Sequence, residues 1–243
     1  MKSTTKAEVM NLIFGRNPVK EALRANKVLK VYITANFSDK DINLLFNEKK
    51  PYIKVVPQGE LDAKARGGVH QGIVAEIKPY EYIDLEEILR RSRKVKLPVI
   101  VILDGIEDTH NLGAILRSCD VFGVTGVLIS KHNQVPLNAT VAKSSAGAIN
   151  YVPVCQIGSI NQTLQVLKDN GFWIVSTDGS ATIDYSKLTY DFPVALVIGS
   201  EGKGVSQLVI KNSDYVVKIP QYGHVNSLNA SVAAGILLSR IRS

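Results

Sequence analysis

Short apolar runs alternate with helical stretches over the rear part of the chain. Strands are predicted at 98–105, 126–130, 151–157, 172–179, 194–199 and 215–220. Helices are predicted between most of them, at 111–123, 138–148, 160–171 and 206–213, and a long apolar helix is expected after 226–229. Because the strands are continuously apolar and helices separate them, an α/β fold with a buried parallel sheet is expected.

Two of these strands run into polar loops. The apolar run 194–198 ends at the glycine-rich loop 199–204, and the strand 215–219 ends at Pro220, ahead of the polar segment 226–229. In α/β folds, loops at the carboxyl ends of neighbouring strands form ligand crevices. The region 195–230 is therefore the first candidate for a ligand site.

The glycine loop does not match the common phosphate-binding loops. Its order is G-x-x-G-x-G rather than G-x-G-x-x-G, and Gly204 follows Lys203 where a P-loop has Ser or Thr. Glu201 within the loop would repel a polyphosphate but suits hydroxyls, amines or a positive charge. An ordinary strand-to-helix turn that needs glycine for positive φ is the alternative, and spacing alone leaves both open.

The front part of the chain predicts a smaller α/β module that ends near Ile77. A helix is expected to open at Asn17-Pro18, and a second to follow a Ser38 cap over 41–50. Strands are predicted at 28–36, 53–58 and 72–77. A linker with a short helix is expected to follow, so that the chain divides into domains 1–78 and 97–243 joined by residues 79–96.

The segment 61–71 of the front module is predicted to be a loop. It carries Lys64, Arg66 and His70 next to Gly67 and Gly68. Glycines beside basic residues let a backbone come close to phosphates. A flexible surface loop without a ligand is the alternative.

Net charge divides the chain more sharply than hydrophobicity does. Residues 1–96 carry 19 Lys and Arg against 12 Asp and Glu, whereas residues 97–243 carry 10 of each. The whole formal charge of +7 therefore belongs to the front. A basic front module on a neutral rear module favours a polyanionic partner, above all nucleic acid, over charge kept for solubility alone.

Composition excludes several other classes of protein. No apolar run has membrane-spanning length, and the N-terminal residues lack the apolar core of a signal peptide, so a cytoplasmic protein without membrane contact is expected. The two cysteines, Cys119 and Cys155, rule out a disulfide scaffold, and with four scattered histidines they provide no metal-ligand spacing.

The predicted helix after Asp104 has one apolar stripe and one arginine pointing away from it. The stripe consists of Leu112, Ile115, Leu116, Cys119 and Phe122. Arg117 is either held over a crevice or pairs with Asp120 three residues on, a common arrangement in solvent. Helix geometry alone favours the ion pair.

Three stretches together resemble a known family. DGIEDTHNLGAILRSCD (104–120), LVIGSEGKGVS (196–206) and IPQYGHVNSLNASVA (219–233) are similar, in order and spacing, to the motifs of the SpoU, or TrmH, family of RNA ribose 2′-O-methyltransferases. FGRNPVKEAL (14–23) and GGVHQGIVA (67–75) resemble the front domain of its RlmB-like branch.

The resemblance implies a SPOUT-type parallel sheet with a C-terminal trefoil knot, preceded by a small L30e-like RNA-binding domain. It implies S-adenosylmethionine as methyl donor and a homodimer with active sites at its interface. The implied reaction is methyl transfer to the ribose 2′-hydroxyl of a guanosine in 23S rRNA. The same chemistry on tRNA and a non-catalytic rRNA-binding or assembly role are alternatives, and a nucleotide-dependent oxidoreductase is disfavoured by the glycine order.

The resemblance also assigns site residues. The implied catalytic residues are Asn111, Arg117, Glu201 and Asn229. The implied donor-binding residues are Thr177, Gly179, Gly199, Ser200, Gly204, Ile219, Ser227 and Leu228. The implied RNA-binding residues are Arg16, Lys64, Arg66 and His70.

Chemistry restricts the roles of these residues. Arginine is effectively never deprotonated, so Arg117 is expected to stabilise alkoxide charge and grip a phosphate. A water, a phosphate oxygen or another side chain would then accept the proton. Asn111 and Asn229 are expected to orient the nucleotide, Glu201 to position Arg117 or the loop, and Ser227 to cap the last helix.

Overall fold

The computed structural model describes residues 11–132, 134–224 and 227–243. The chain forms two compact units. The first comprises the described residues up to Tyr80 together with Leu137–Asn150, and the second comprises Glu81–Pro136 and Tyr151–Ser243. Within the described residues, no helix has the length and apolar character that a membrane crossing requires.

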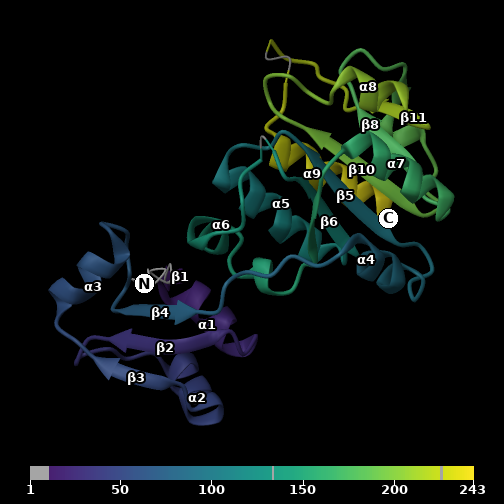
Figure 1. Cartoon of the computed structure of the whole chain (residues 1–243). Coiled ribbons are helices and arrows are strands. Elements are labelled where there is room, and N and C mark those ends of the chain that lie inside the picture. Colours follow the sequence, from purple (N-terminus) through teal and green to yellow (C-terminus); the bar gives the residue numbers. More distant parts are fainter. Residues whose placement is uncertain (1–10, 133, 225–226) are drawn as a thin grey trace, which may run out of the picture. The chain divides into compact units, whose positions relative to one another are not determined.

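The first unit is built on a four-stranded sheet (Figure 1). The strands are β1 (Asn11–Phe14), β4 (Ile73–Ile77), β2 (Val28–Ile33) and β3 (Tyr52–Val55), in that order. β4 is antiparallel to both of its neighbours, and β3 is parallel to β2. The helices of this unit are α1 (Arg16–Arg24), α2 (Lys40–Lys49) and α3 (Gln58–Ala65), whose apolar residues supply much of its core.

Local details of the first unit differ from the sequence prediction. α1 begins after Gly15, whose φ of 91° needs glycine, and not at Asn17. Asp39, rather than Ser38, caps α2 by accepting a hydrogen bond from the Ile42 amide at 3.1 Å. The predicted loop 61–71 begins inside α3, because buried Leu61 and Ala65 pack that helix against the sheet.

The first unit also includes a segment from the predicted rear domain. Leu137–Asn150 contains α6 (Ala139–Ser144) and a short 3₁₀ helix (Ala148–Asn150), and it packs on β1 and α1. Gly147 has a φ of 94°, and a Cβ there would lie 2.3 Å from the Glu21 Cβ. This close approach explains why glycine follows α6.

The second unit has a seven-stranded sheet in which every neighbouring pair is parallel, as the continuous apolar runs predicted. In spatial order the strands are β7 (Val154–Ile157), β6 (Gly126–Ser130), β5 (Val99–Asp104), β10 (Val194–Gly199), β8 (Trp173–Thr177), β11 (Tyr215–Lys218) and β9 (Ile183–Asp184). β5 and β10 lie at the centre and are almost entirely buried.

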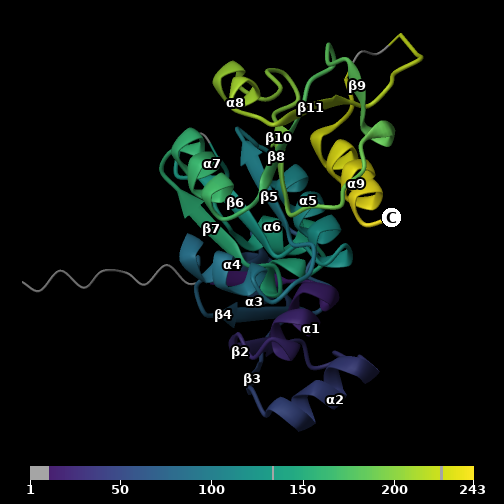
Figure 2. The ribbon, with the colours of Figure 1, turned by 90° about the vertical axis from the view of Figure 1, so that its right-hand side faces the viewer.

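Helices cover this sheet (Figures 1 and 2). One core cluster joins the sheet to α4 (Leu85–Ser92), α7 (Ile160–Asp169) and α8 (Gln207–Lys211). α5 (Thr109–Val121) packs against α9 (Ala230–Ile241), which lies on β10. Ile88 and Leu89 of α4 are buried in the cluster, so the predicted linker 79–96 contributes to the core of the second unit.

The end of the chain is anchored by one arginine. The Arg242 guanidinium donates to the carbonyls of Leu97, Phe122 and Gly123 at 2.8, 2.9 and 2.7 Å. Partial burial lowers the pKa of Arg242. These bonds join the end of α9 to the end of α5 and to the entry of β5.

Candidate active site

The sheet order brings three strand ends to one pocket. β8 lies between β10 and β11, so the loop after β8 joins the two loops that the sequence singled out. The resulting pocket has a volume of about 180 Å³. It is lined by all the implied donor-binding residues, namely Thr177, Gly179, Gly199, Ser200, Gly204, Ile219, Ser227 and Leu228.

The glycine loop owes its shape to two close backbone contacts. The Gly204 amide donates to the Ser200 carbonyl at 2.8 Å, and the Ser200 amide donates to the Asp104 carbonyl at 3.1 Å. A Cβ on Gly199 would lie 2.1 Å from the carbonyl carbon of Gly204, whose own φ is 65°. The prediction of glycine for positive φ is therefore confirmed at Gly204, whereas Gly199 is required because a Cβ would meet the backbone. The turn also forms one wall of the pocket.

Two carboxylates at strand ends were given no role of their own from the sequence, although Asp178 lies between the implied donor-binding residues Thr177 and Gly179. Asp104, at the end of β5, accepts a hydrogen bond from the Ser206 amide at 2.8 Å and so fixes the far end of the glycine loop. Asp178 lines the pocket after β8, and hydrogen bonds from the Ser180 side chain and amide lower its pKa. Asp104 follows an apolar run directly, and Asp178 comes at the end of the predicted strand 172–179, so position at a strand end is a signal that could have identified both.

Three polar side chains from distant parts of the chain form a closed network beside the pocket. Asn111 Nδ2 donates to Glu201 Oε1 at 2.8 Å, and Asn229 Nδ2 donates to Asn111 Oδ1 at 2.9 Å. Asn229 Nδ2 also donates to Glu201 Oε1. The network therefore joins the first turn of α5, the glycine loop and the start of α9, one residue from each of the three motifs.

The network leaves few polar atoms for a ligand. Both Nδ2 hydrogens of Asn229 are used, and its Oδ1 caps α9 by accepting from the Ser231 and Val232 amides. Asn229, not Ser227, is thus the cap of the last helix. Asn111, which is 8% exposed, keeps one N–H, and Glu201 keeps its second carboxylate oxygen.

Arg117 lies apart from this network. It is on the exposed side of α5, opposite the buried residues Leu112, Ile115 and Cys119, and it lines neither this pocket nor the cleft beside it. Within the described part of the chain no ion pair joins it to Asp120, so the expected pairing is wrong. Glu201 positions the two asparagines rather than Arg117.

A larger cleft of about 740 Å³ adjoins the pocket. It shares Ser200, Glu201 and Gly204 with the pocket and extends over the carboxyl ends of β5, β6 and β7. Its remaining lining includes the segment Asp104–Asp108, His132 and Lys203. The glycine loop therefore separates two cavities that meet at Glu201.

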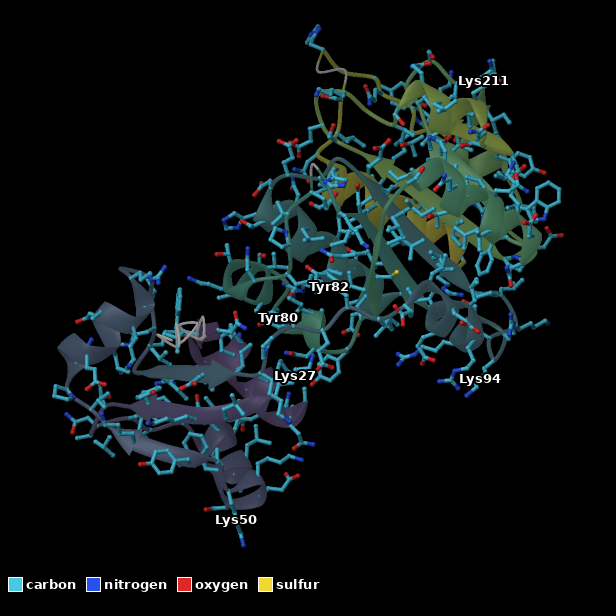
Figure 3. The ribbon with its side chains drawn as sticks, in the orientation of Figure 1. Lys27, Lys50, Tyr80, Tyr82, Lys94 and Lys211 are labelled. Carbon is cyan, nitrogen blue, oxygen red and sulfur yellow. The ribbon has the colours of Figure 1, made fainter. Side chains whose placement is uncertain are left out.

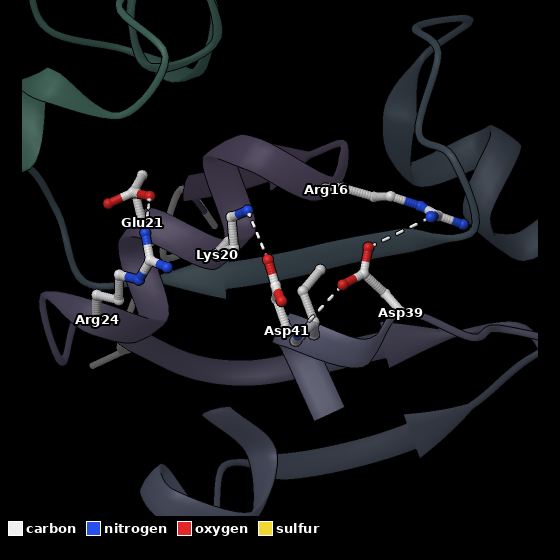
Figure 4. Close-up of polar contacts among 7 residues, drawn as sticks. Arg16, Lys20, Glu21, Arg24, Asp39 and Asp41 are labelled. Carbon is white, nitrogen blue, oxygen red and sulfur yellow. Dashed lines mark hydrogen bonds and ion pairs between the residues drawn. The ribbon is translucent and has the colours of Figure 1, made fainter. Parts of the chain in front are cut away.

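Most of the cations expected to bind RNA have partners within the first unit. Arg16 pairs with Asp39 at 3.3 Å (Figure 4). Its guanidinium also lies 5.7 Å from the centre of the Phe37 ring. Lys64 lies 3.7 Å from Glu60 and 4.3 Å from the centre of the Tyr32 ring. Both cations are therefore partly neutralised at the surface.

The segment after α3 is closely packed. The His70 side chain is 5% exposed, and its Nε2 lies 3.0 Å from Asp62 Oδ1 while its Nδ1 accepts from the Gly72 amide at 3.0 Å. Both ring nitrogens are thus used, and His70 has a structural role. Arg66, in the left-handed conformation after α3, is exposed, and the described residues offer it no ion-pair partner. It is the cation of this segment that remains free for a ligand.

Other cations extend from the surfaces of both units. Figure 3 shows Lys50 projecting from the end of α2, and Lys94 and Lys211 at the surface of the second unit. Lys27 lies 5.8 Å from the centre of the Tyr80 ring, and burial raises the pKa of that tyrosine. Lys50 is thus a further exposed cation of the first unit.

Comparison with known proteins identifies both parts of the chain. Residues 98–239 match the SpoU rRNA Methylase family, and residues 12–83 match the family described as RNA 2′-O ribose methyltransferase substrate binding. The chain is 45% identical, over 235 residues, to a Staphylococcus aureus protein assigned by name to the TrmH family of tRNA/rRNA methyltransferases. That alignment covers 95% of this chain and 94% of the relative.

Solved structures share the fold. The SpoU methyltransferase AviRb from Streptomyces viridochromogenes superposes with a TM-score of 0.81 at 22% identity, over 96% of this chain and 88% of that chain. An AdoMet-bound rRNA methyltransferase from Sinorhizobium meliloti gives 0.79 at 21% identity, over 96% and 86%. A TrmH/SpoU tRNA modifying enzyme from A. aeolicus is 33% identical with a TM-score of 0.55, over 65% and 82%.

The three motifs meet at the network of Asn111, Glu201 and Asn229. They lie in a chain with family matches in both parts and similar proteins over nearly its whole length. Residues 225–226 of the third motif are outside the described residues. The match over 98–239 spans more than half of the chain. The chain belongs to the SpoU rRNA methylase family.

Proposed function

We propose that this protein transfers a methyl group from S-adenosylmethionine to a ribose 2′-hydroxyl of RNA. The observation that carries the proposal is the network of Asn111, Glu201 and Asn229 at the point where a small pocket and a larger cleft meet. One cavity suits a donor and the other an acceptor, and fixed polar groups lie between them. Such an arrangement lowers the barrier to a direct transfer mainly by aligning the reactants.

The smaller pocket fits S-adenosylmethionine chemically. Ile198, Val217 and Ile219 provide apolar surface for an adenine ring, and Asp178 and Thr177 provide polar atoms for ribose hydroxyls. The close backbone approach at Gly199 leaves peptide groups, rather than side chains, at one wall. The bound donor supplies a methyl group on a positively charged sulfur, which the carboxylate of Glu201 would stabilise.

The network also suggests how a proton is handled. Asn111 and Asn229 hold Oε1 of Glu201, so the second oxygen of that carboxylate is fixed in direction. We assign this oxygen as the acceptor of the proton from the 2′-hydroxyl, and the remaining N–H of Asn111 as a donor to the ribose. A positioned acid–base group typically contributes about 10²–10⁴-fold to a rate.

Arg117 would join the site in a homodimer. Within one chain it lies outside both cavities, whereas Val121, beside it on α5, and Val232 on α9 are 72% and 49% exposed. Exposed apolar residues on two packed helices support a symmetric contact between copies. The partner subunit's Arg117 would then stabilise alkoxide charge and grip the adjacent phosphate.

Guanosine in 23S rRNA is the proposed substrate, and tRNA is the second candidate. The chain matches a substrate-binding family over 12–83, in addition to the methylase family. The alignment with the A. aeolicus tRNA modifying enzyme covers only 65% of this chain. This chain thus has a front unit that the alignment with the tRNA enzyme largely leaves out, and that unit is basic. Both points support a large structured RNA as the target.

A labelling experiment tests the activity. Purified protein is incubated with labelled S-adenosylmethionine and either unmodified 23S rRNA or tRNA. Label on a ribose of 23S rRNA is expected. Label on a base, or no label from a protein that binds the donor, would refute the activity, and label on tRNA alone would favour the second candidate.

Replacement of Arg117 tests its role. Arg117→Ala is expected to lower the transfer rate about 10²–10³-fold, the usual cost of removing one group that stabilises transition-state charge. The dissociation constant for S-adenosylmethionine, measured by calorimetry, should change less than about twofold. An unchanged rate would leave Arg117 as a solvent-exposed arginine without a role in transfer.

The family resemblance supports three further proposals. The C-terminal segment forms a trefoil knot, the front unit is L30e-like, and the protein acts in the cytoplasm. In the sheet, the neighbouring strands β10 and β8 lie between β5 and β11. This order is compatible with a C-terminal segment that is threaded through a loop. Tracing an experimental structure through residues 219–230 would test the knot.

A further inference from the structure

We propose that the larger cleft holds the base of the acceptor nucleoside and that Glu107 recognises the Watson–Crick edge of guanine. This inference rests on the proposed function and names the group that selects its substrate. No motif residue assigned above explains why one base should be preferred over another. The cleft contains a carboxylate that the transfer chemistry does not use.

The position of the cleft follows from the reaction. A ribose hydroxyl can meet the donor only where the two cavities join, at Ser200, Glu201 and Gly204. With the ribose there, the attached base extends into the rest of the cleft, over the ends of β5 and β6. Its volume of about 740 Å³ lies within the usual range of about 300–1,000 Å³ for ligand pockets.

The other carboxylates of the cleft are already engaged. Asp104 accepts from the Ser206 amide at 2.8 Å, and Asp108 accepts from the His110 amide at 2.8 Å. Glu201 holds the two asparagines. Glu107 lines the cleft, is exposed, and makes no hydrogen bond or ion pair with any described residue.

The backbone that carries Glu107 is held on both sides. The amide of buried Ile106 donates to Gln134 Oε1 at 3.0 Å, and its carbonyl accepts from the Val135 amide at 3.3 Å. On the other side, Asp108 is the cap of α5. A free carboxylate on a fixed backbone is suited to reading the hydrogen-bonding edge of a ligand.

The cleft does not suit a metal ion. Among the described residues, no group of three His, Cys, Asp or Glu side chains is arranged to bind one. Lys203 and His132 also line the cleft. Lys203, which is cationic, disfavours a bound metal ion and suits the phosphates on either side of a nucleoside.

The chemistry of a carboxylate selects among the four bases. An ionised glutamate only accepts hydrogen bonds. The Watson–Crick edge of guanine offers two adjacent donors, N1–H and the N2 amino group, whereas adenine offers an acceptor at N1 beside its amino group. Proteins commonly read unpaired RNA bases through hydrogen bonds to this edge. Glu107 therefore favours an unpaired guanosine.

Two substitutions test this assignment. Glu107→Ala removes the acceptor, and Glu107→Gln provides one donor and one acceptor, which match adenine. RNA from cells that lack this protein is methylated with labelled S-adenosylmethionine and digested, and the label is measured in each 2′-O-methylnucleoside. Wild type should label guanosine, Glu107→Ala should lose about tenfold or more of that label, and Glu107→Gln should shift label towards adenosine.

The matched control is Glu86→Gln. Glu86 is an exposed glutamate on α4 and has no partner among the described residues. The assignment would be overturned if Glu107→Ala kept guanosine label within twofold of this control. It would also be overturned if the wild-type protein placed its label on the ribose of a nucleoside other than guanosine. Absence of any ribose label would instead refute the proposed function. Binding of guanosine and adenosine 5′-monophosphates, followed by NMR, separates the two cases. Guanosine binding that Glu107→Ala does not weaken would also overturn the assignment.

Discussion

The polar network of the second unit and the ion pairs of the first differ in how far apart their members lie in sequence. Asn111, Glu201 and Asn229 are separated by up to 118 positions and converge beside two cavities. On the first unit, Arg24 and Glu21 are three residues apart, and Lys20 and Asp41 are 21 apart (Figure 4). The first set is held by the whole sheet, whereas the second needs only neighbouring helices.

This difference shows which polar groups carry function. Exposed ion pairs such as Lys20–Asp41 contribute about 0–1 kcal/mol each, and they reduce the charge available to a partner. A partly buried hydrogen-bonded network costs about 1–3 kcal/mol when one member is lost, because the others are left unsatisfied. The network of Asn111, Glu201 and Asn229 lies beside a cavity and is costly to disrupt. Its residues are therefore better candidates for catalytic roles than the exposed ion pairs are.

The largest expected effect is that of Gly199→Ala. The added Cβ would meet the Gly204 backbone at 2.1 Å, so the glycine loop must move. We expect a loss of about 3 kcal/mol in stability and at least about 100-fold in affinity for S-adenosylmethionine. Calorimetry and thermal unfolding measure both.

The control for that change lies in the same loop. Nothing comes within 4 Å of a Cβ placed on Gly202, so Gly202→Ala should bind the donor almost as the wild type does. Equal affinities in the two variants would show that the close contact at Gly199 does not shape the pocket.

Glu201→Gln is expected to have the next largest effect. The amide keeps an oxygen for Asn111 and Asn229 but loses the charge and the proton-accepting oxygen. The transfer rate should fall about 100-fold, while the melting temperature changes by no more than about 2 °C. Glu201→Ala removes the network as well and should lower both the rate and the melting temperature. A Gln variant with the wild-type rate would exclude Glu201 as the proton acceptor.

A smaller effect is expected from Arg66→Ala. Arg66 has no ion-pair partner among the described residues, so its loss should weaken RNA binding. The slope of the logarithm of the binding constant against the logarithm of the salt concentration should become shallower by about 0.7–0.9, the value for one phosphate contact. Arg16→Ala, which also frees Asp39, is the comparison, and its slope should change less. Filter binding at several salt concentrations measures both slopes, and a larger change for Arg16 would reverse this ranking.

The smallest effect is expected at a surface ion pair of the second unit. Hydrogen bonds from Arg90 and Arg91 hold the pKa of Glu87 at about 2, below its ordinary value of 4.5. The ionised Glu87 carboxylate therefore stabilises the folded protein above pH 4.5, and this contribution is lost as the pH falls towards 2. Glu87→Gln should melt slightly below the wild type at pH 7 and together with it near pH 2.

Glu86→Gln serves as the control for this measurement, since Glu86 has no ion-pair partner in the described part of the chain. The melting temperatures of all three proteins are compared at both pH values. A difference between Glu87→Gln and the wild type that persists near pH 2 would show that the ion pairs are not its cause.

Much of the fold could be predicted because its signals are local. The continuous apolar runs predicted a parallel sheet, which the structure confirms, and the stripe of α5 predicted the buried positions of Leu112, Ile115, Leu116 and Cys119. The start of α1 and the helix α3 were predicted wrongly. Both depend on contacts with the sheet, at Gly15 and Leu61, rather than on local capping signals.

The candidate site was predicted only as a set of residues. The motifs identified Asn111, Glu201 and Asn229, and the family comparison confirms the resemblance on which they rested. Their hydrogen bonds, and the free carboxylate of Glu107, could not be predicted, because they depend on the position of β8 between β10 and β11 and on the path of each loop.

The sequence by itself determined the family, the parallel sheet and the uneven distribution of charge, since motifs, apolar runs and composition are all readable along the chain. Only the tertiary structure decided which polar groups are free and which are already bound. Arg16 and His70 are engaged, whereas Arg66 and Glu107 are not. The physical reason is that a hydrogen bond or ion pair needs two groups within about 3–4 Å, and folding alone sets that distance.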